Sequence, residues 1–444
     1  MRKNQRLIIL VMALFSILLL ILIVGPEAGR AIAAANDGGN SAAATSGDSD
    51  SAAVPAGEEN AVPTSAGQID SLKPDVVDSS DESTGPGIGN EPSDVTEEIA
   101  LPEAAFELKY DKYPLTYTYL LVEKESVNIR KGPSPAESVL KAEPKNEKLN
   151  YIETITNETG GWHHVTWQEN DSRLFGFVTV DSVTMRTFQF DKMYQAVLTA
   201  EKARKAGPLT FISNYHNLKG NAPLYHGGEV DKTGGRRSQS APGYPNPADL
   251  REFSYLSDGT LVRVLSAGSQ YTRVALVQDE KIYFVPNQYV ASPAAVFAVN
   301  KAVVIDRTNQ NEAVFEKIGL DWKIVSYTLA TTGTTGEYHQ PTSLGFYYGI
   351  EKRERFYYYE DGTTKIQGYA PYAIRFSGGA YVHGVPVNYK YDADGNRIDP
   401  GKVEYSRTLG TVPLSHKCVR NYTSHAKFLY DWYTPGDMAV IVIE

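Results

Sequence analysis

Cysteine is nearly absent from this chain of 444 residues, in which Cys418 is the single example. One cysteine excludes an intramolecular disulfide, and it excludes a structural zinc site that needs several thiolates. Cys418 is therefore either an inert buried thiol or a reactive nucleophile. The residues around Cys418 indicate whether the thiol is inert or reactive.

Basic residues are also scarce where a nucleic-acid partner would need them. The net charge of −10 arises in residues 36–104, which hold 15 Asp or Glu and one Lys. Residues 105–444 are close to neutral and contain no basic stripe. We therefore expect no nucleic-acid partner.

The first 35 residues predict an export signal. Arg2, Lys3 and Arg6 precede an apolar run from Leu7 to Val24. This run fits a cleaved signal peptide and an uncleaved signal anchor equally well. Both interpretations place the rest of the chain outside the cytoplasm, and the second adds a membrane partner. Residues 36–104, rich in small and acidic residues, predict a disordered acidic linker.

Short strands separated by turns predict two small β modules. In residues 105–188, the segment Ser126–Arg130 alternates apolar and polar side chains and runs into a Gly-Pro turn. Residues 189–296 predict a helical connector and then a weaker copy of the same pattern, with strands over 221–225, 259–265, 271–276 and 283–286. Trp162 either stacks on a ligand or fills the first core, and the core position is favoured.

Residues 297–444 predict a third, mostly β domain. Lys301–Asp306 and Met438–Ile443 are nearly continuous apolar runs of strand length, and residues 314–325 read as a hairpin. A further apolar strand ends at His383, and one helix is expected from Thr423 to Trp432.

The single cysteine lies in the segment Ser415-His416-Lys417-Cys418-Val419-Arg420. A thiol becomes a nucleophile when a neighbour takes its proton, and His383 on a rigid strand is a suitable base. His383, His416 and Cys418 are also zinc-type ligands, but their spacing is not that of a standard zinc site. We therefore predict no metal and no cofactor.

These motifs carry two family resemblances. VNIRKGPSP, GGWHHV and FGFV resemble a bacterial SH3-like domain. His383-Gly384, SHKCVR, the VVID strand, the TTG loop and Pro341-Thr342 resemble the L,D-transpeptidase catalytic domain over the last third of the chain. The implied fold is mainly β, with an L,D-transpeptidase-like β-sandwich catalytic domain preceded by one or two small SH3-like β-barrels.

The second resemblance implies a catalytic role for each residue near the thiol. Cys418 would be the nucleophile and His383 the general base. Ser415, or a backbone carbonyl near Gly384, would orient the imidazole, and His416 would lie beside the site.

The same resemblance implies the substrate-binding residues. Arg420 would hold a substrate carboxylate or brace the loop, and Lys417 would contribute to an oxyanion hole through its backbone N–H. Tyr381, on the strand that ends at His383, and His339, on a loop at the rim, complete the predicted set.

The sequence departs from the family pattern in two places. Lys417 replaces a glycine, which costs about 1 kcal/mol or more if that position needs a positive φ. If it does not, the lysine can point outward, and its charge favours the thiolate. The gap between His383 and Ser415 is about twice the usual one, and the extra residues 389–406 predict an inserted hairpin or flap.

The sequence thus predicts an exported L,D-transpeptidase that forms 3→3 peptidoglycan cross-links through a Cys418 thioester. Stem peptides and, through the SH3-like modules, cell-wall glycan would be its partners, and its location would be the cell wall. Two alternatives remain open. One is an L,D-carboxypeptidase that hydrolyses the thioester, and the other is a non-catalytic wall-binding protein inactivated at Lys417.

Overall fold

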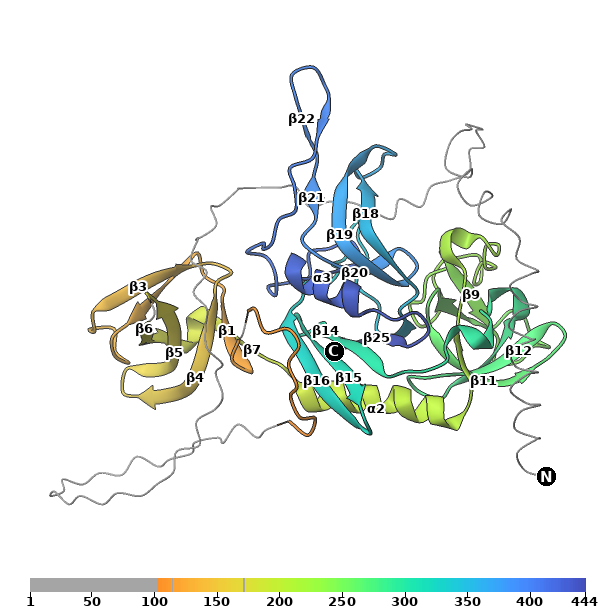
Figure 1. Cartoon of the computed structure of the whole chain (residues 1–444), viewed down its shortest axis with the longest axis horizontal. Coiled ribbons are helices and arrows are strands. Elements are labelled where there is room, and N and C mark those ends of the chain that lie inside the picture. The colour runs from red at the N-terminus through yellow and green to blue at the C-terminus, as the bar shows by residue number, and fades with distance from the viewer. Residues whose placement is uncertain (1–101, 114, 171) are drawn as a thin grey trace, which may run out of the picture. The chain divides into compact units, whose positions relative to one another are not determined.

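A computed structural model describes residues 102–113, 115–170 and 172–444 (Figure 1). The predicted signal segment, residues 1–35, and residues 36–101 of the predicted linker lie outside the described residues. Every described residue belongs to one compact unit of the chain. Within these ranges, no helix is long and apolar enough to cross a membrane. The described part is mainly β, as the sequence predicts.

The first module is a single antiparallel sheet with the strand order β3-β2-β6-β5-β4-β1-β7. Its strands are β1 (Thr118–Val122), β2 (Ser126–Arg130), β3 (Val139–Pro144), β4 (Lys148–Asn157), β5 (Gly160–Glu169), β6 (Ser172–Thr179) and β7 (Val183–Thr187). Trp162 is buried in this module, as favoured above. No pairing among the described residues joins β3 to β7, so the expected closed SH3-like barrel is not confirmed.

The second module begins with the helix α2 (Phe190–Ala206). Its strands are β8 (Leu209–Phe211), β9 (Ser240–Gly243), β10 (Ser254–Ser257), β11 (Leu261–Ala267), β12 (Tyr271–Leu276) and β13 (Ile282–Pro286). They form a sheet of order β13-β12-β11-β8 and a separate β9–β10 pair. The prediction of a strand over residues 221–225 is wrong. Pro223 has no N–H to donate to a ladder, and β8 takes the place beside β11 instead.

The C-terminal domain consists of two sheets packed face to face. One has the order β16-β15-β14-β25-β17, and the other contains β18-β19-β20-β24, with β21 paired to β19. The strands are β14 (Lys301–Asp306), β15 (Asn311–Ile318), β16 (Asp321–Leu329), β17 (Gly345–Tyr348), β18 (Glu351–Tyr359), β19 (Ile366–Ser377), β20 (Ala380–His383), β21 (Val387–Asn388), β24 (Val419–Arg420) and β25 (Met438–Ile443). The helix α3 spans Thr423–Trp432, as predicted.

Alternation along β14 builds the two cores of this domain. Val303 and Ile305 face the second sheet and pack with Ile374, Phe376 and Val382. Their neighbours Ala302 and Val304 face the opposite way, toward buried residues of α2. The helix predicted as a mere connector therefore covers the outer face of the β16-β15-β14-β25-β17 sheet (Figure 1).

Residues just before β1 also pair with the edge strand β16 of the C-terminal domain. The N–H groups of Glu107 and Lys109 donate to the carbonyls of Ile324 (2.9 Å) and Val325 (2.8 Å) on β16. The segment predicted to open the first module therefore extends the edge of the C-terminal sheet.

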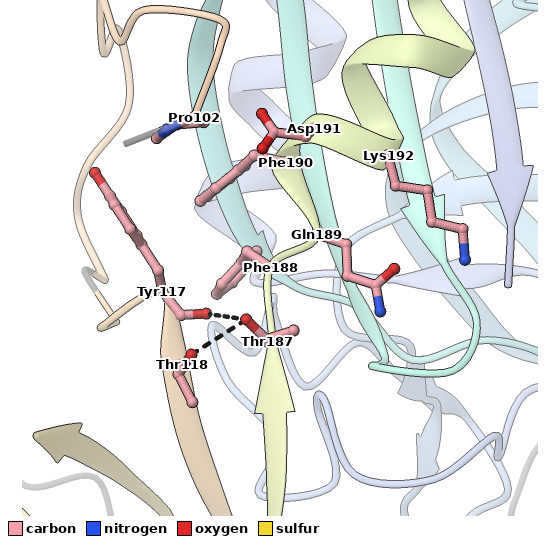
Figure 2. Close-up of a pocket in the computed structure, with 9 residues that line it drawn as sticks. All are labelled: Pro102, Tyr117, Thr118, Thr187, Phe188, Gln189, Phe190, Asp191 and Lys192. Carbon is pink, nitrogen blue, oxygen red and sulfur yellow. Dashed lines mark hydrogen bonds between the residues drawn. The ribbon is translucent and has the colours of Figure 1, made fainter. Parts of the chain in front are cut away.

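The first module joins α2 through a tight connection after β7. Figure 2 shows Thr118 and Thr187 in contact there, with their hydroxyl oxygens 3.2 Å apart. The Thr187 hydroxyl also donates to the carbonyl of Tyr117 (3.2 Å), and the rings of Phe188 and Phe190 stack 5.5 Å apart. The pocket drawn in Figure 2 lies at this junction and includes none of the predicted site residues.

The inserted segment 389–406 contains the predicted hairpin, in which β22 (Lys390–Tyr391) pairs with β23 (Arg397–Ile398). Its return arm is bound to the start of α3, since Thr423 N donates to the carbonyl of Glu404 (3.0 Å). Just beyond it, the Arg407 carbonyl accepts from Lys148 Nζ (2.8 Å). The arm therefore joins the first module to the C-terminal domain.

The second module docks on the C-terminal domain through a close backbone approach at Gly259. This residue has a φ of +84°, and its carbonyl accepts from Tyr348 N (2.9 Å). A Cβ placed on Gly259 would lie 1.8 Å from the carbonyl oxygen of Phe376. Only glycine allows this approach without a backbone shift.

We predict that Gly259→Ala destabilises the protein far more than Gly227→Ala. Gly227 has the same φ of +84° but no atom within 4 Å of its added Cβ. The control therefore carries only the conformational cost, about 1 kcal/mol, whereas Gly259→Ala adds an overlap worth about 1–3 kcal/mol. Differential scanning calorimetry of both variants measures this, and equal losses would contradict the docking described here.

Candidate active site

His383 ends β20, and Cys418 immediately precedes β24, the parallel neighbour of β20. β24 pairs with β20 in the register Val382 with Val419 and His383 with Arg420. Val382 and Val419 point into the sandwich core, so by alternation the flanking side chains point to the other face. The packing of Cys418 with Tyr381 confirms this orientation. The pairing therefore brings the thiol and the imidazole to the same face of the sheet.

The thiol of Cys418 is largely enclosed. The residue is 9% exposed, and Sγ lies 3.7 Å from the carbonyl oxygen of Gly379 in the turn between β19 and β20. A thiol in this position has little contact with bulk water.

The imidazole of His383 is held neutral with a defined tautomer. Nδ1 lies 2.6 Å from the Gly384 carbonyl, which can only accept, so Nδ1 carries the proton and Nε2 keeps its lone pair. Burial, opposed by the Gly384 hydrogen bond and assisted by the positive charge of Arg420, lowers the pKa of His383 to about 4. A neutral imidazole with a free lone pair is a competent base.

Gly384 is required at its position for steric reasons. A Cβ there would lie 2.8 Å from the hydroxyl of Thr423 and 3.0 Å from the ring of Pro371. The Thr423 hydroxyl is needed in place, because it accepts from Val385 N (3.0 Å). The packing that excludes a side chain at Gly384 therefore fixes the carbonyl that orients His383.

Hydroxyl groups brace the loop that carries Cys418. The Ser415 hydroxyl donates to the Cys418 carbonyl, and the Thr342 hydroxyl donates to the Lys417 carbonyl (2.8 Å). Gly333 N in turn donates to the Thr342 hydroxyl (2.8 Å). Of the two groups considered for orienting the imidazole, the Gly384 carbonyl contacts His383, whereas Ser415 supports the loop that carries Cys418.

Lys417 has no backbone strain. The non-glycine residues with positive φ among the described part of the chain do not include it, so the missing glycine costs nothing in conformation. Its side chain reaches Gly378, where an added Cβ would lie 3.4 Å from Nζ. Lys417 therefore introduces no backbone strain that could inactivate the site.

Arg420 is a buried cation close to the thiol. Burial lowers the pKa of its guanidinium, while the nearby Cys418 and Tyr358 side chains raise it. Its backbone N–H donates to the Thr331 carbonyl (2.9 Å), and its carbonyl accepts from Thr331 N (3.0 Å). Among the described side chains, Nε of Arg420 has no hydrogen-bond partner. A buried positive charge beside Cys418 favours the thiolate.

His416 and His339 stack on one another at the rim. Their ring centroids are 3.6 Å apart, and His416 Nε2 lies 3.5 Å from Asp361. Burial, followed by the charge of His339, lowers the pKa of His416 to about 3, and burial raises the pKa of Asp361. The structure thus places His339 beside His416, in the loops around the nucleophile.

Tyr381 is placed differently from the sequence expectation of a substrate-binding residue. It is 0% exposed, and its ring stacks on Phe356 at 4.1 Å. Its hydroxyl lies 3.3 Å from that of Tyr215 in the second module. Because the side chain is fully covered, Tyr381 supports the wall of the site from behind.

Several residues that contact Cys418 or the residues around it were not predicted from the sequence. They come from turns and a strand of the C-terminal domain and from the second module: Tyr215, Gln239, Asp258, Tyr358, Asp361 and Gly379. No local motif marks them. Among the described residues, no group of three or more His, Cys, Asp or Glu could hold a metal ion.

Comparison with solved structures gives distant matches. An L,D-transpeptidase from Mycobacterium smegmatis is 14% identical over 41% of this chain and 82% of its own, with a TM-score of 0.26. One from Mycobacterium tuberculosis H37Rv is 17% identical over 42% of this chain and 92% of its own, with a TM-score of 0.25. TM-scores this low support no closer comparison.

A third match is a fused Zn-dependent amidase/peptidase/peptidoglycan-binding protein from Clostridium acetobutylicum, 19% identical over 32% of this chain with a TM-score of 0.22. This chain spans about half, 52%, of that protein's length. No curated protein matches the chain.

The family comparison is more specific. Residues 300–442 match the family model described as YkuD, the L,D-transpeptidase catalytic domain. The matched range contains both strands that carry Cys418 and His383. It covers neither of the two preceding modules. Residues 300–442 of this chain therefore carry an L,D-transpeptidase catalytic domain.

Proposed function

We propose that this chain is an exported L,D-transpeptidase that forms 3→3 cross-links between peptidoglycan stem peptides through a thioester on Cys418. The observation that carries the proposal is the parallel β20–β24 pairing, which presents Cys418 and a buried, neutral His383 on the same face. A thiol beside a neutral imidazole is the arrangement that cysteine acyl transfer needs.

In the first step, Cys418 Sγ attacks the carbonyl of the third residue of the donor stem. The C–S bond forms, and the C–N bond to the terminal D-alanine breaks. His383 Nε2 takes the thiol proton and gives it to the leaving amine nitrogen. Backbone N–H groups of Lys417 and Cys418 stabilise the oxyanion, and the buried charge of Arg420 favours the attacking thiolate.

In the second step, an amine of a neighbouring stem attacks the thioester. The C–N bond of the cross-link forms, the C–S bond breaks, and the amine proton passes through His383 to the sulfur. Water in place of the amine gives a free tripeptide, which is the L,D-carboxypeptidase alternative. The enclosed thiol, 9% exposed, favours transfer to a bound amine over hydrolysis.

The preceding segments fit this role outside the cytoplasm. Residues 1–35 export the chain as a cleaved signal peptide or a membrane anchor, and residues 36–104 act as a tether. Residues 105–188 and 189–296 resemble SH3-like modules and bring the catalytic domain to the cell-wall glycan. Just beyond the flap, residues 389–406, the Arg407 carbonyl accepts from Lys148 Nζ of the first module, which holds that module close to the flap.

We predict that the full chain, incubated with a disaccharide-tetrapeptide, releases D-alanine and gains the mass of the acylated donor. Because Cys418 is the only cysteine, a thioester adduct locates the nucleophile without ambiguity. Intact-protein mass spectrometry detects the adduct, and chromatography separates cross-linked dimers from tripeptide. Cys418→Ala abolishes the adduct, and His383→Gln slows its formation roughly 10²–10⁴-fold.

Each product distinguishes one activity. Dimers select transpeptidation, and tripeptide without dimers selects carboxypeptidation. A folded wild-type chain that gives neither product nor adduct, yet binds sacculi, is the non-catalytic wall-binding protein and refutes the enzyme. Gln168→Ala, in an exposed part of β5, is a control that leaves the chemistry intact.

We also predict that His383 stays neutral down to about pH 4. Its pKa is lowered from 6.5, so its contribution to stability is present above pH 6.5 and is lost as the pH falls toward 4. Histidine-detected ¹H–¹⁵N NMR follows the ring, with His383→Gln to assign the signal. A midpoint at or above pH 6.5, or a proton on Nε2 in the neutral form, would argue against the base assigned here.

A further inference from the structure

The turn beside the thiol is held from outside the catalytic domain. Asp258, in the second module, is 1% exposed and accepts from Gly378 N (3.2 Å) and Arg375 Nη1 (2.5 Å). Its other oxygen accepts from Asn214 N (2.7 Å) in its own module. The next residue of the turn, Gly379, carries the carbonyl that lies 3.7 Å from Cys418 Sγ. Asp258 therefore fastens a loop of the second module to the rim of the active site.

This loop is kept in a conformation that non-glycine residues rarely adopt. His216, Asn217 and Gln239 have φ values of 52°, 54° and 51°. His216 N donates to the side-chain oxygen of Gln239 (3.0 Å), and Gln239 N donates to that of Asn217 (2.8 Å). Left-handed backbone at such residues persists where the surroundings fix it, and it gathers at ligand sites.

The aromatic rings of the loop form a wall next to the site. The Tyr215 hydroxyl lies 3.3 Å from that of Tyr381, and the Arg375 guanidinium lies 4.0 Å from the Tyr215 ring centroid. The exposed His216 ring lies 3.9 Å from that of Tyr215. The Tyr215 side of this wall contacts Tyr381 and Arg375, whereas His216 is exposed.

The loop of the second module and the turn at Gly378 and Gly379 meet along a line of contact, here called the seam. Lys417 brings a positive charge to this seam. A Cβ on Gly378 would lie 3.4 Å from Lys417 Nζ and 3.5 Å from the Gln239 side-chain oxygen, so both groups flank this glycine. Within the described residues, no Asp or Glu forms an ion pair with Lys417. The ammonium is therefore available to an anionic ligand.

We infer that this seam is a subsite for the terminal carboxylate of the donor peptide. Lys417 would supply the charge, and the Tyr215–His216 loop and Gln239 of the second module would supply the wall. In the proposed reaction, on which this inference rests, the carboxylate of the leaving residue lies one residue, about 3.8 Å, beyond the attacked carbonyl. Lys417 Nζ lies beside Gly378, and the carbonyl of the next residue, Gly379, lies 3.7 Å from Cys418 Sγ. The ammonium is therefore one residue along the turn from the group that contacts the sulfur.

The test measures binding to the full chain carrying Cys418→Ala, in which no turnover competes. Two ligands differ at one group: a stem tetrapeptide with a free C-terminal carboxylate and the same peptide with a C-terminal amide. Isothermal titration calorimetry is expected to show about tenfold tighter binding of the carboxylate form. Adding Lys417→Met removes this preference, whereas adding Lys281→Met, an exposed lysine of the second module, leaves it.

The contribution of the second module is tested with Asp258→Asn, which loses the buried charge that holds Arg375 and Gly378. We expect the carboxylate preference to fall several-fold, while the exposed control Asp279→Asn keeps it. Near-UV circular dichroism checks the fold of each variant. If Asp258→Asn does not fold, Lys417→Met alone decides.

The outcomes separate the subsite from the reaction. A carboxylate preference that survives Lys417→Met, or no preference in the parent protein, overturns the subsite. A preference that Lys417→Met removes supports it, even if the wild-type chain forms no Cys418 adduct and the proposed reaction fails. An adduct without any preference leaves the reaction standing and refutes the subsite alone.

Discussion

The parallel pairing of β20 with β24 is the constraint on which the site depends. Two strands brought together from distant parts of the sequence share only two residue pairs, Val382 with Val419 and His383 with Arg420. The valines anchor these short strands in the sandwich core, and strict alternation then turns Cys418 and His383 outward together. A shift of one residue in this register would bury the imidazole in the core and separate it from the thiol.

Burial then sets the chemistry of the paired residues. The same enclosure that leaves Cys418 only 9% exposed lowers the pKa of His383 and keeps its ring neutral. Arg420 lies beside both, so its charge lowers the pKa of the base and favours the thiolate. Hydroxyl donors from Ser415 and Thr342 fix the loop that carries Cys418. Packing and hydrogen bonds therefore hold Cys418 and His383 in place.

Local patterns in the sequence predict much of the catalytic domain. The strands Lys301–Asp306 and Met438–Ile443 and the helix Thr423–Trp432 have the predicted bounds, because apolar periodicity reports directly on burial. The family of residues 300–442 was also predictable, since its motif is short and continuous in the sequence. The pairing of Cys418 with one particular histidine needed the family motif as well, because spacing alone does not specify which strands are neighbours.

Other features depend on long-range contacts that no local pattern encodes. The role of α2 as a cover of the sheet that contains β14 and β15 follows from its packing on Val304 and Phe315, far along the chain. Asp258 looks like an ordinary turn residue in the sequence, yet it is buried against Arg375, 117 residues away. The predicted barrels were not confirmed, because strand patterns specify neither the strand order nor whether a sheet closes.

The most direct test of this account is a crystal structure of the full chain trapped as its acyl-enzyme with a stem tetrapeptide. The account predicts continuous density from Cys418 Sγ to the carbonyl of the third stem residue, with His383 Nε2 facing the sulfur from the same side of the β20–β24 pair. A peptide bound without a covalent bond to Cys418, or a His383 ring on the opposite face of that pair, would contradict it.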